Sequence, residues 1–247
     1  MRGIVRAAAA TIFLFLAATA NAADGQKMVL PAQERQVHVT YFRAPGDGPR
    51  PAALLLHGAN GFDSQIGGYS AYASELAAHG IDAYLVYYYS DADQENMFGG
   101  NDVFVKRYAA WTRLIGDVAG DILQGKVSNG KIGLVGFSNG GTLAGGTAAR
   151  DPRITAAVIY YGTSPFPMDV PVKHFPPLLI LHGDADAIIP VEQGRHLADF
   201  AKALGSSAEF VVDPGERHGF GARLQAANAT DALNRTIAFL SRELNPR

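Results

Sequence analysis

Residues 136–140 of the chain read Gly-Phe-Ser-Asn-Gly, which is the pattern G-x-S-x-G. The β-prone run 132–135 precedes this stretch, and residues 141–150, which are rich in small side chains, follow it as a predicted helix. Between a strand and a helix, a serine in this pattern lies on a sharp turn with its hydroxyl clear of the backbone. The flanking glycines leave room for that turn. The pentapeptide therefore predicts an accessible hydroxyl at Ser138.

Apolar runs typical of buried strands alternate with segments of helical spacing along the rest of the chain. This alternation predicts an α/β fold with a mostly parallel central sheet and helices on both of its faces. The first two predicted strands are close enough in sequence to pair. The predicted strands are 28–30, 37–42, 52–56, 81–88, 132–135, 154–161, 178–181 and 208–212, and the predicted helices are 69–79, 104–123, 141–150, 191–204 and 230–244.

The composition is that of a globular protein. Of the 247 residues, 48% are hydrophobic and 18% are charged, which allows one α/β domain with a large core. No internal repeat or long linker divides residues 23–247, so we expect a single domain there. The formal net charge is -2, and this balance favours neither nucleic acid nor an anionic membrane surface as a partner.

The first 22 residues have the pattern of a secretory signal peptide. Arg2 and Arg6 form a positive region, residues 7–18 are apolar, and residues 20–22 are a small-x-small cleavage site. The apolar run is shorter than the roughly 20 residues that span a bilayer, so no stable membrane insertion is expected after cleavage. We therefore expect cleavage after Ala22 and a periplasmic or secreted protein.

The chain contains no cysteine. It therefore has no disulfides, no thiol nucleophile and no cysteine zinc site. No HExxH pattern and no pair of histidines four residues apart is present in the sequence. We expect neither a metal nor another cofactor.

Ser138, Asp186 and His218 each follow one of the predicted strands. Ligands of parallel sheets bind beyond the carboxyl ends of the strands, so these side chains are expected to meet at one edge. Their order along the chain, serine then aspartate then histidine, is that of an α/β-hydrolase.

The three residue types fit nucleophilic catalysis. The hydroxyl of Ser138 becomes a nucleophile when a base, here His218, removes its proton during attack. Asp186 would hold the imidazole in the useful tautomer and stabilise the imidazolium. The backbone N–H groups of Ala59 and Asn139 are the candidate donors of an oxyanion hole.

Four stretches carry a resemblance to a known family: L-H-G-A-N-G at 56–61, G-F-S-N-G-G at 136–141, L-H-G-D-A-D-A-I-I-P at 181–190 and R-H-G-F at 217–220. With these motifs, the sequence resembles the dienelactone hydrolase family of α/β-hydrolases from about residue 37 to residue 244. The resemblance implies the α/β-hydrolase fold and the Ser138, Asp186 and His218 triad. The namesake enzymes use a cysteine nucleophile and a glutamate on the loop after the first core strand. In this chain Ser138 stands at the position of the nucleophile, and His57 is on that loop. The chain therefore looks more like serine-bearing relatives, which implies carboxylesterase-type activity.

Two other carboxylates compete with Asp186. Chains that resemble this pattern place the acid second in the D-x-D pair, so Asp184 is interpreted as a loop-capping residue. Asp213 precedes a Pro-Gly turn and is a third choice. Of the remaining histidines, His57 and His182 each follow a core strand and precede a glycine, and are interpreted as structural side chains that bond nearby backbone.

Residues near the predicted strand ends are candidates for the pocket wall. They are His57, Asn60, Tyr88 and Tyr161. The segments 91–103 and 163–177 are the expected rims, because long loops at this edge shape specificity.

The sequence thus predicts an exported serine hydrolase that cleaves a small carboxylic ester or lactone through an acyl-enzyme. One alternative keeps the fold and changes the reaction to that of a peptidase, amidase or acyltransferase. Another is a non-catalytic binding protein on a hydrolase scaffold, since fold alone does not establish chemistry.

Overall fold

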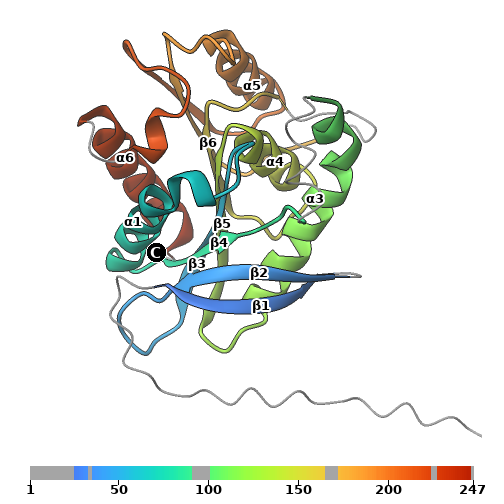
Figure 1. The fold of residues 1–247 in the computed structure, drawn as a ribbon, viewed down its shortest axis with the longest axis vertical. Helices are drawn as coiled ribbons and strands as arrows, with labels where there is room; N and C mark the ends of the chain where they lie inside the picture. The colour runs from blue at the N-terminus through green and yellow to red at the C-terminus, as the bar shows by residue number, and fades with distance from the viewer. Residues whose placement is uncertain (1–24, 33–34, 91–100, 165–171, 224–226, 246–247) are drawn as a thin grey trace, which may run out of the picture.

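The computed structural model describes residues 25–32, 35–90, 101–164, 172–223 and 227–245 (Figure 1). The predicted signal peptide, residues 1–22, lies outside the described residues. So do residues 91–100 and 165–171, which make up much of the two predicted pocket rims.

The described strands form one eight-stranded sheet in the order β1-β2-β4-β3-β5-β6-β7-β8. The pairs β1–β2 and β2–β4 are antiparallel, and all other neighbours are parallel. The mostly parallel sheet and the pairing of its first two strands are thereby confirmed. The strands are β1 Gln26–Ala32, β2 Arg35–Phe42, β3 Arg50–Leu56, β4 Asp82–Val86, β5 Ser128–Phe137, β6 Ala156–Tyr160, β7 Leu178–Gly183 and β8 Ala208–Asp213.

Helices cover both faces of this sheet, as predicted. On one side α3, α4 and α5 pack on the sheet, and on the other side α1 and α6 do so (Figure 1). Gly80 follows the first helix with a φ of 85°, the left-handed conformation that ends many helices. The helices are α1 Ile66–Ala78, α3 Asn101–Leu123, α4 Asn139–Ala148, α5 Val191–Ala203 and α6 Ala227–Leu244, with short 3₁₀ turns η1 Asp63–Gln65 and η3 Phe220–Ala222.

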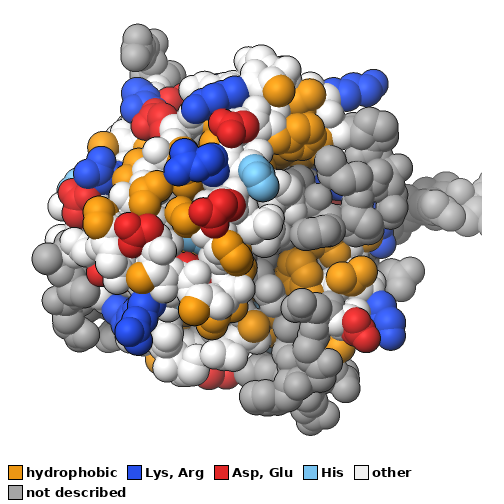
Figure 2. All heavy atoms as spheres, turned by 90° about the horizontal axis from the view of Figure 1, so that it is seen from above, with side chains coloured by type: hydrophobic (Ala, Val, Ile, Leu, Met, Phe, Trp, Pro, Cys, Tyr) orange, Lys and Arg blue, Asp and Glu red, His pale blue; other side chains and the backbone are white. Residues whose placement is uncertain are grey.

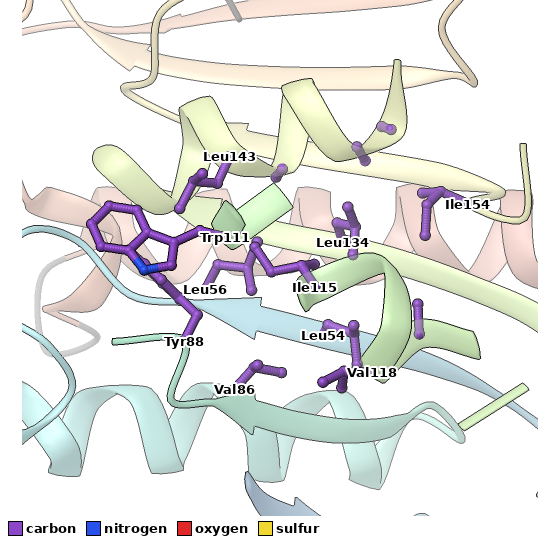
Figure 3. Close-up of a cluster of buried hydrophobic side chains, with 14 of the residues drawn as sticks. Leu54, Leu56, Val86, Tyr88, Trp111, Ile115, Val118, Leu134, Leu143 and Ile154 are labelled. Atoms are coloured by element: carbon purple, nitrogen blue, oxygen red, sulfur yellow. The ribbon is translucent and has the colours of Figure 1, made fainter. Parts of the chain in front are cut away.

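The core on the α3 side of the sheet is continuous from the sheet centre to the carboxyl ends of the strands. Successive side chains of β3 point to opposite faces, so Leu54 and Leu56 share this face and pack with Ile115 of α3 (Figure 3). Beyond the end of β4, the ring of Tyr88 lies edge-on to Trp111, with 5.6 Å between ring centroids. This packing fixes the strand ends, from which the functional loops project.

The surface carries both signs of charge. On the face seen in Figure 2, acidic and basic side chains are interspersed among hydrophobic and uncharged ones. Among the residues that the structure describes, no helix has both the length and the apolar character needed to cross a membrane.

Candidate active site

Ser138 lies on a strained turn between β5 and α4. Its φ of 56° and ψ of -117° are outside the regions that a non-glycine residue ordinarily occupies. Two backbone hydrogen bonds hold the turn: Ser138 N–H donates to the Tyr160 carbonyl, and Thr142 N–H donates to the Ser138 carbonyl, both at 3.0 Å. The sharp strand–turn–helix connection predicted from the pentapeptide is confirmed.

The glycines on either side of this turn lie against other backbone. A Cβ atom at Gly136 would be 2.0 Å from the carbonyl oxygen of Gly140. At Gly140, it would be 2.2 Å from the carbonyl oxygen of Leu56, the last residue of β3. Only glycine fits at either position, and the close contact brings the loop after β3 next to Ser138.

Ser138, His218 and Asp186 form a continuous chain of hydrogen bonds. The Ser138 hydroxyl Oγ lies 2.9 Å from Nε2 of His218. Nδ1–H of the same imidazole donates a hydrogen bond to Oδ2 of Asp186, with 2.7 Å between the two atoms. These residues come from loops after β5, β8 and β7, so the convergence expected from the sequence is present.

The carboxylate of Asp186 is fully buried and held from several sides. Its Oδ1 accepts hydrogen bonds from the backbone N–H groups of Ile188 and Ile189, at 2.8 and 2.9 Å. Its Oδ2 lies 3.4 Å from Nε2 of His182, in addition to the contact with His218. The orientation of this carboxylate is therefore fixed by the loop that carries it.

His182 is a structural side chain that bonds the nearby backbone, as predicted. Its Nε2–H donates to the Ile189 carbonyl at 2.9 Å. Burial lowers the pKa of His182, so the ring is neutral at neutral pH. It thus connects the end of β7 to the loop that carries Asp186.

Asp184 and Asp213, the two carboxylates that compete with Asp186 for the role of the acid, have other surroundings. Oδ1 of Asp184 accepts the Gly215 N–H at 2.6 Å, so Asp184 caps a neighbouring loop, as expected. Asp213, at the end of β8, is buried, and its Oδ2 has no hydrogen-bond partner among the described residues. Burial raises the pKa of Asp213 to about 6, and Asp231 and Glu216 add to this shift against the opposing Arg235.

Asp213→Asn should change how stability depends on pH. In the unfolded chain this carboxyl titrates near pH 4, so between about pH 4 and pH 6 its ionisation favours unfolding. The stability that the protonated carboxyl contributes is therefore lost as the pH rises through about 6. The asparagine variant does not lose this stability. The free energy of unfolding of Asp213→Asn minus that of wild type should therefore be about 1–3 kcal/mol larger at pH 8 than at pH 4. Urea unfolding at both pH values measures this difference, and an equal effect at both would contradict it.

Ser138 and His218 open onto a pocket of about 870 Å³. Ala59, Asn139, Asn60 and Tyr161 also line this pocket, as the sequence interpretation expected. The loop after β3 approaches the serine closely, since a Cβ atom on Gly58 would lie 3.4 Å from Cβ of Ser138. The Tyr161 ring packs against His218, with 4.8 Å between ring centroids.

The predicted pocket roles of His57 and Tyr88 are wrong. Both side chains are buried behind the pocket wall and do not line it. The two rings stack with 4.0 Å between their centroids, and Nδ1–H of His57 donates to the Gly58 carbonyl at 2.7 Å. The Tyr88 hydroxyl donates to the His57 carbonyl at 2.6 Å. Both residues therefore support the loop from the core side, and the interpretation of His57 as a structural histidine is the one confirmed.

Burial also keeps His57 uncharged. It lowers the pKa of His57 to about 4, because the ring is enclosed by aromatic side chains. His57 is therefore neutral at the pH at which the site would work.

Several pocket residues were not predicted from the sequence. They come from the start of α3, from α4, from the η1–α1 region, and from the loop after β7 together with the start of α5. The signal that could have found the last group is a pair of consecutive isoleucines in a loop that otherwise carries acidic residues. Thr163, which also lines the pocket, belongs to the predicted rim 163–177. The unpredicted lining residues include Ser64, Gln65, Tyr69, Phe104, Val105, Thr142, Ile188, Ile189, Pro190 and Gln193.

The arrangement as a whole provides a hydroxyl, a base aimed at it and a buried acid that orients the base. It faces a cavity large enough for a small organic substrate. Within the described parts of the chain, no group of three metal-ligating side chains is placed to hold a metal ion.

Curated proteins match part of the chain. A Yersinia pestis protein assigned as a carboxymethylenebutenolidase is 31% identical over 120 residues, which cover 43% of this chain and 45% of that protein. The chain thus spans less than half the length of the curated relatives that it matches.

Solved structures share the fold. A Klebsiella pneumoniae protein assigned as a dienelactone hydrolase superimposes with a TM-score of 0.73 at 22% identity, covering 88% of this chain and 98% of that one. An esterase of Pyrobaculum calidifontis gives a TM-score of 0.72 at 19% identity, covering 90% and 87%. These likenesses establish the α/β-hydrolase fold. Residues 68–244, most of the chain, match the model of the dienelactone hydrolase family, and the chain belongs to that family.

Proposed function

We propose that this protein is a serine hydrolase that cleaves a small carboxylic ester or lactone through an acyl-enzyme. The observation that carries the proposal is the unbroken hydrogen-bond chain from Ser138 through His218 to Asp186, open to the pocket at its serine end. Family membership and the esterase-like fold support ester chemistry.

In this proposal, Oγ of Ser138 attacks the carbonyl carbon of the ester, and its proton passes to Nε2 of His218. The tetrahedral intermediate then collapses, the bond to the alcohol oxygen breaks, and that oxygen takes the proton from Nε2. The acyl-enzyme remains on Ser138. In the second stage, a water molecule gives a proton to Nε2 of His218 and attacks the carbonyl carbon of the acyl-enzyme. The bond to Oγ then breaks, the carboxylic acid leaves, and Oγ takes the proton back from Nε2. Asp186 stabilises the imidazolium at both stages.

The negative charge on the former carbonyl oxygen needs hydrogen-bond donors. We assign this role to the backbone N–H groups of Asn139 and Ala59. Asn139 begins α4, so its N–H is one of the groups that a helix leaves unpaired. Ala59 follows Gly58, whose backbone lies next to Ser138. Both segments lie next to Ser138, where donors to the oxygen of the tetrahedral intermediate are required.

We further propose that the protein is exported and cleaved after Ala22. The support is the order of charge, apolar run and small residues in 1–22.

Labelling with a fluorophosphonate probe tests the hydrolase proposal without a known substrate. We expect the native protein to be modified at Ser138, with the site mapped by mass spectrometry, and the urea-unfolded protein to remain unlabelled. His218→Gln should slow labelling by about 100-fold or more, because the general base is lost. Modification at another serine, or no labelling of the folded protein, would contradict the proposal.

A further inference from the structure

Where the structure describes it, the lining of the pocket that holds Ser138 consists of uncharged residues and His218. Among the described residues that line it, there is no lysine, arginine, aspartate or glutamate. The internal segments that the structure does not describe, 33–34, 91–100, 165–171 and 224–226, contain no lysine or arginine in their sequence. A substrate carboxylate entering this pocket would therefore lose water without gaining a cation.

A basic residue does lie in the neighbourhood, on an adjoining hollow. Arg223 lines a smaller cavity of about 350 Å³ that shares Ser64 and Gln65 with the main pocket. The Arg223 side chain is exposed, and exposed charges are screened by water and salt. It does not line the cavity that holds Ser138 and His218.

Apolar side chains stand at the mouth of the main pocket. Val105, at the start of α3, is 52% exposed, and Ile188, after β7, is 72% exposed. Single exposed apolar residues are common on protein surfaces. Here two of them belong to the lining of one pocket that contains the proposed nucleophile, and the apolar side chains of Phe104, Ile189 and Pro190 lie beside them in that lining. An apolar group of a substrate would cover them.

The polar groups of the lining are neutral donors and acceptors. The amides of Asn60, Gln65 and Gln193 can bond carbonyl or hydroxyl oxygens of a substrate. Thr142 and Thr163 bond each other, with 3.2 Å between their hydroxyl oxygens. None of these groups compensates a full charge.

We infer that the substrates of this site are uncharged esters whose apolar part contacts Val105 and Ile188, and that carboxylate-bearing esters are rejected. This inference rests on the proposed function. Val105 and Ile188 are specificity-determining residues in this scheme. Ile188 also contributes its backbone N–H to Asp186, so its side chain can be changed while that hydrogen bond is kept.

Two esters with the same leaving group test the inference. One is mono-4-nitrophenyl adipate, whose acyl chain ends in a carboxylate, and the other is its methyl ester, which has the same chain without the charge. For the wild-type protein we expect kcat/KM to be about 100-fold higher for the methyl ester, because transfer of an uncompensated charge out of water is costly. Release of 4-nitrophenol measures both rates.

A lysine at the pocket mouth should reduce this preference. We expect Ile188→Lys to lower the ratio of the two kcat/KM values by about fivefold. A cation in the lining of the same cavity offsets part of the carboxylate's loss of water, and exposure of position 188 to solvent keeps the effect small. Val127→Lys is the matched control, since Val127 is 40% exposed, lies outside the pocket lining and takes the same charge change. Val127→Lys should leave the ratio of the two kcat/KM values within about twofold of the wild-type ratio, since exposed charges at a distance are screened.

The outcomes separate the two proposals. If the wild-type protein hydrolyses the carboxylate ester as fast as the methyl ester, the inference is wrong while the hydrolase proposal stands. The inference is also wrong if Val127→Lys changes the ratio as much as Ile188→Lys, or if Arg223→Gln lowers turnover of the carboxylate ester selectively. If neither ester is hydrolysed and the fluorophosphonate does not label Ser138, the proposed function itself fails, and the inference fails with it.

Discussion

Ser138→Ala should lower kcat for ester hydrolysis by about 10⁴-fold or more, because the acyl-enzyme can no longer form. The other proposed groups would remain in place, since Ser138 is held by backbone hydrogen bonds that alanine keeps. KM should change little, as the missing hydroxyl contributes mainly to the transition state. Steady-state hydrolysis of 4-nitrophenyl esters measures both constants, and circular dichroism checks that the variant is folded.

Ser128→Ala is the matched control for this experiment. Ser128 begins the strand that ends next to Ser138, and its hydroxyl accepts an exposed hydrogen bond from the Gly130 N–H at 3.1 Å. Loss of the Ser128 hydroxyl should leave kcat within a few fold of the wild-type value. If Ser138→Ala retained wild-type turnover, the serine would have no catalytic role and the hydrogen-bond chain would have to serve another purpose.

Much of the fold could be predicted from the sequence because its central strands β3, β4, β6 and β7 are buried on both faces. Such strands appear as continuous apolar runs, and their ends then locate the loops that meet at one edge. The positions of the strand ends are therefore enough to bring Ser138, Asp186 and His218 together. The helices can be recognised because their apolar residues recur with helical spacing.

Side-chain direction was not predictable in the same way. His57 directly follows a core strand, which is where residues of a site are expected, yet its ring turns into the core and stacks on Tyr88. Its direction depends on the aromatic side chains around it, which come from other segments of the chain. Asn60, three residues later on the same loop, does line the pocket. A position at the strand end was therefore insufficient to distinguish a supporting residue from a lining one.

The pocket mouth was not predicted for a related reason. Val105 and Ile188 are far apart in the sequence, and each by itself resembles an ordinary surface residue. Their significance depends on belonging to the same cavity as Ser138, which only the packing of α3 near the loop after β7 reveals. The sharp turn at Ser138, by contrast, was predicted from the glycines around it.

Gly140→Ala should prevent the protein from folding stably. A Cβ atom there would lie 2.2 Å from the Leu56 carbonyl oxygen and 2.5 Å from that of His57, and both are backbone atoms at the end of a central strand. They cannot move aside without shifting the middle of the sheet. We expect a loss of about 4 kcal/mol or more, a large part of the roughly 5–15 kcal/mol that stabilises a typical domain. Urea denaturation, or the soluble yield if little folded protein remains, measures the effect.

Gly67→Ala shows whether that loss comes from the close backbone contact or from replacing a helical glycine. Gly67 lies in α1, and a Cβ atom there would have no neighbour within 4 Å. Because alanine favours helices, this variant should be as stable as wild type or up to about 1 kcal/mol more stable. If Gly140→Ala unfolded at the wild-type urea concentration, α4 could not lie as close to β3 as the structure places it. The position of Ser138 beside the loop after β3, on which the oxyanion assignment depends, would then be lost as well.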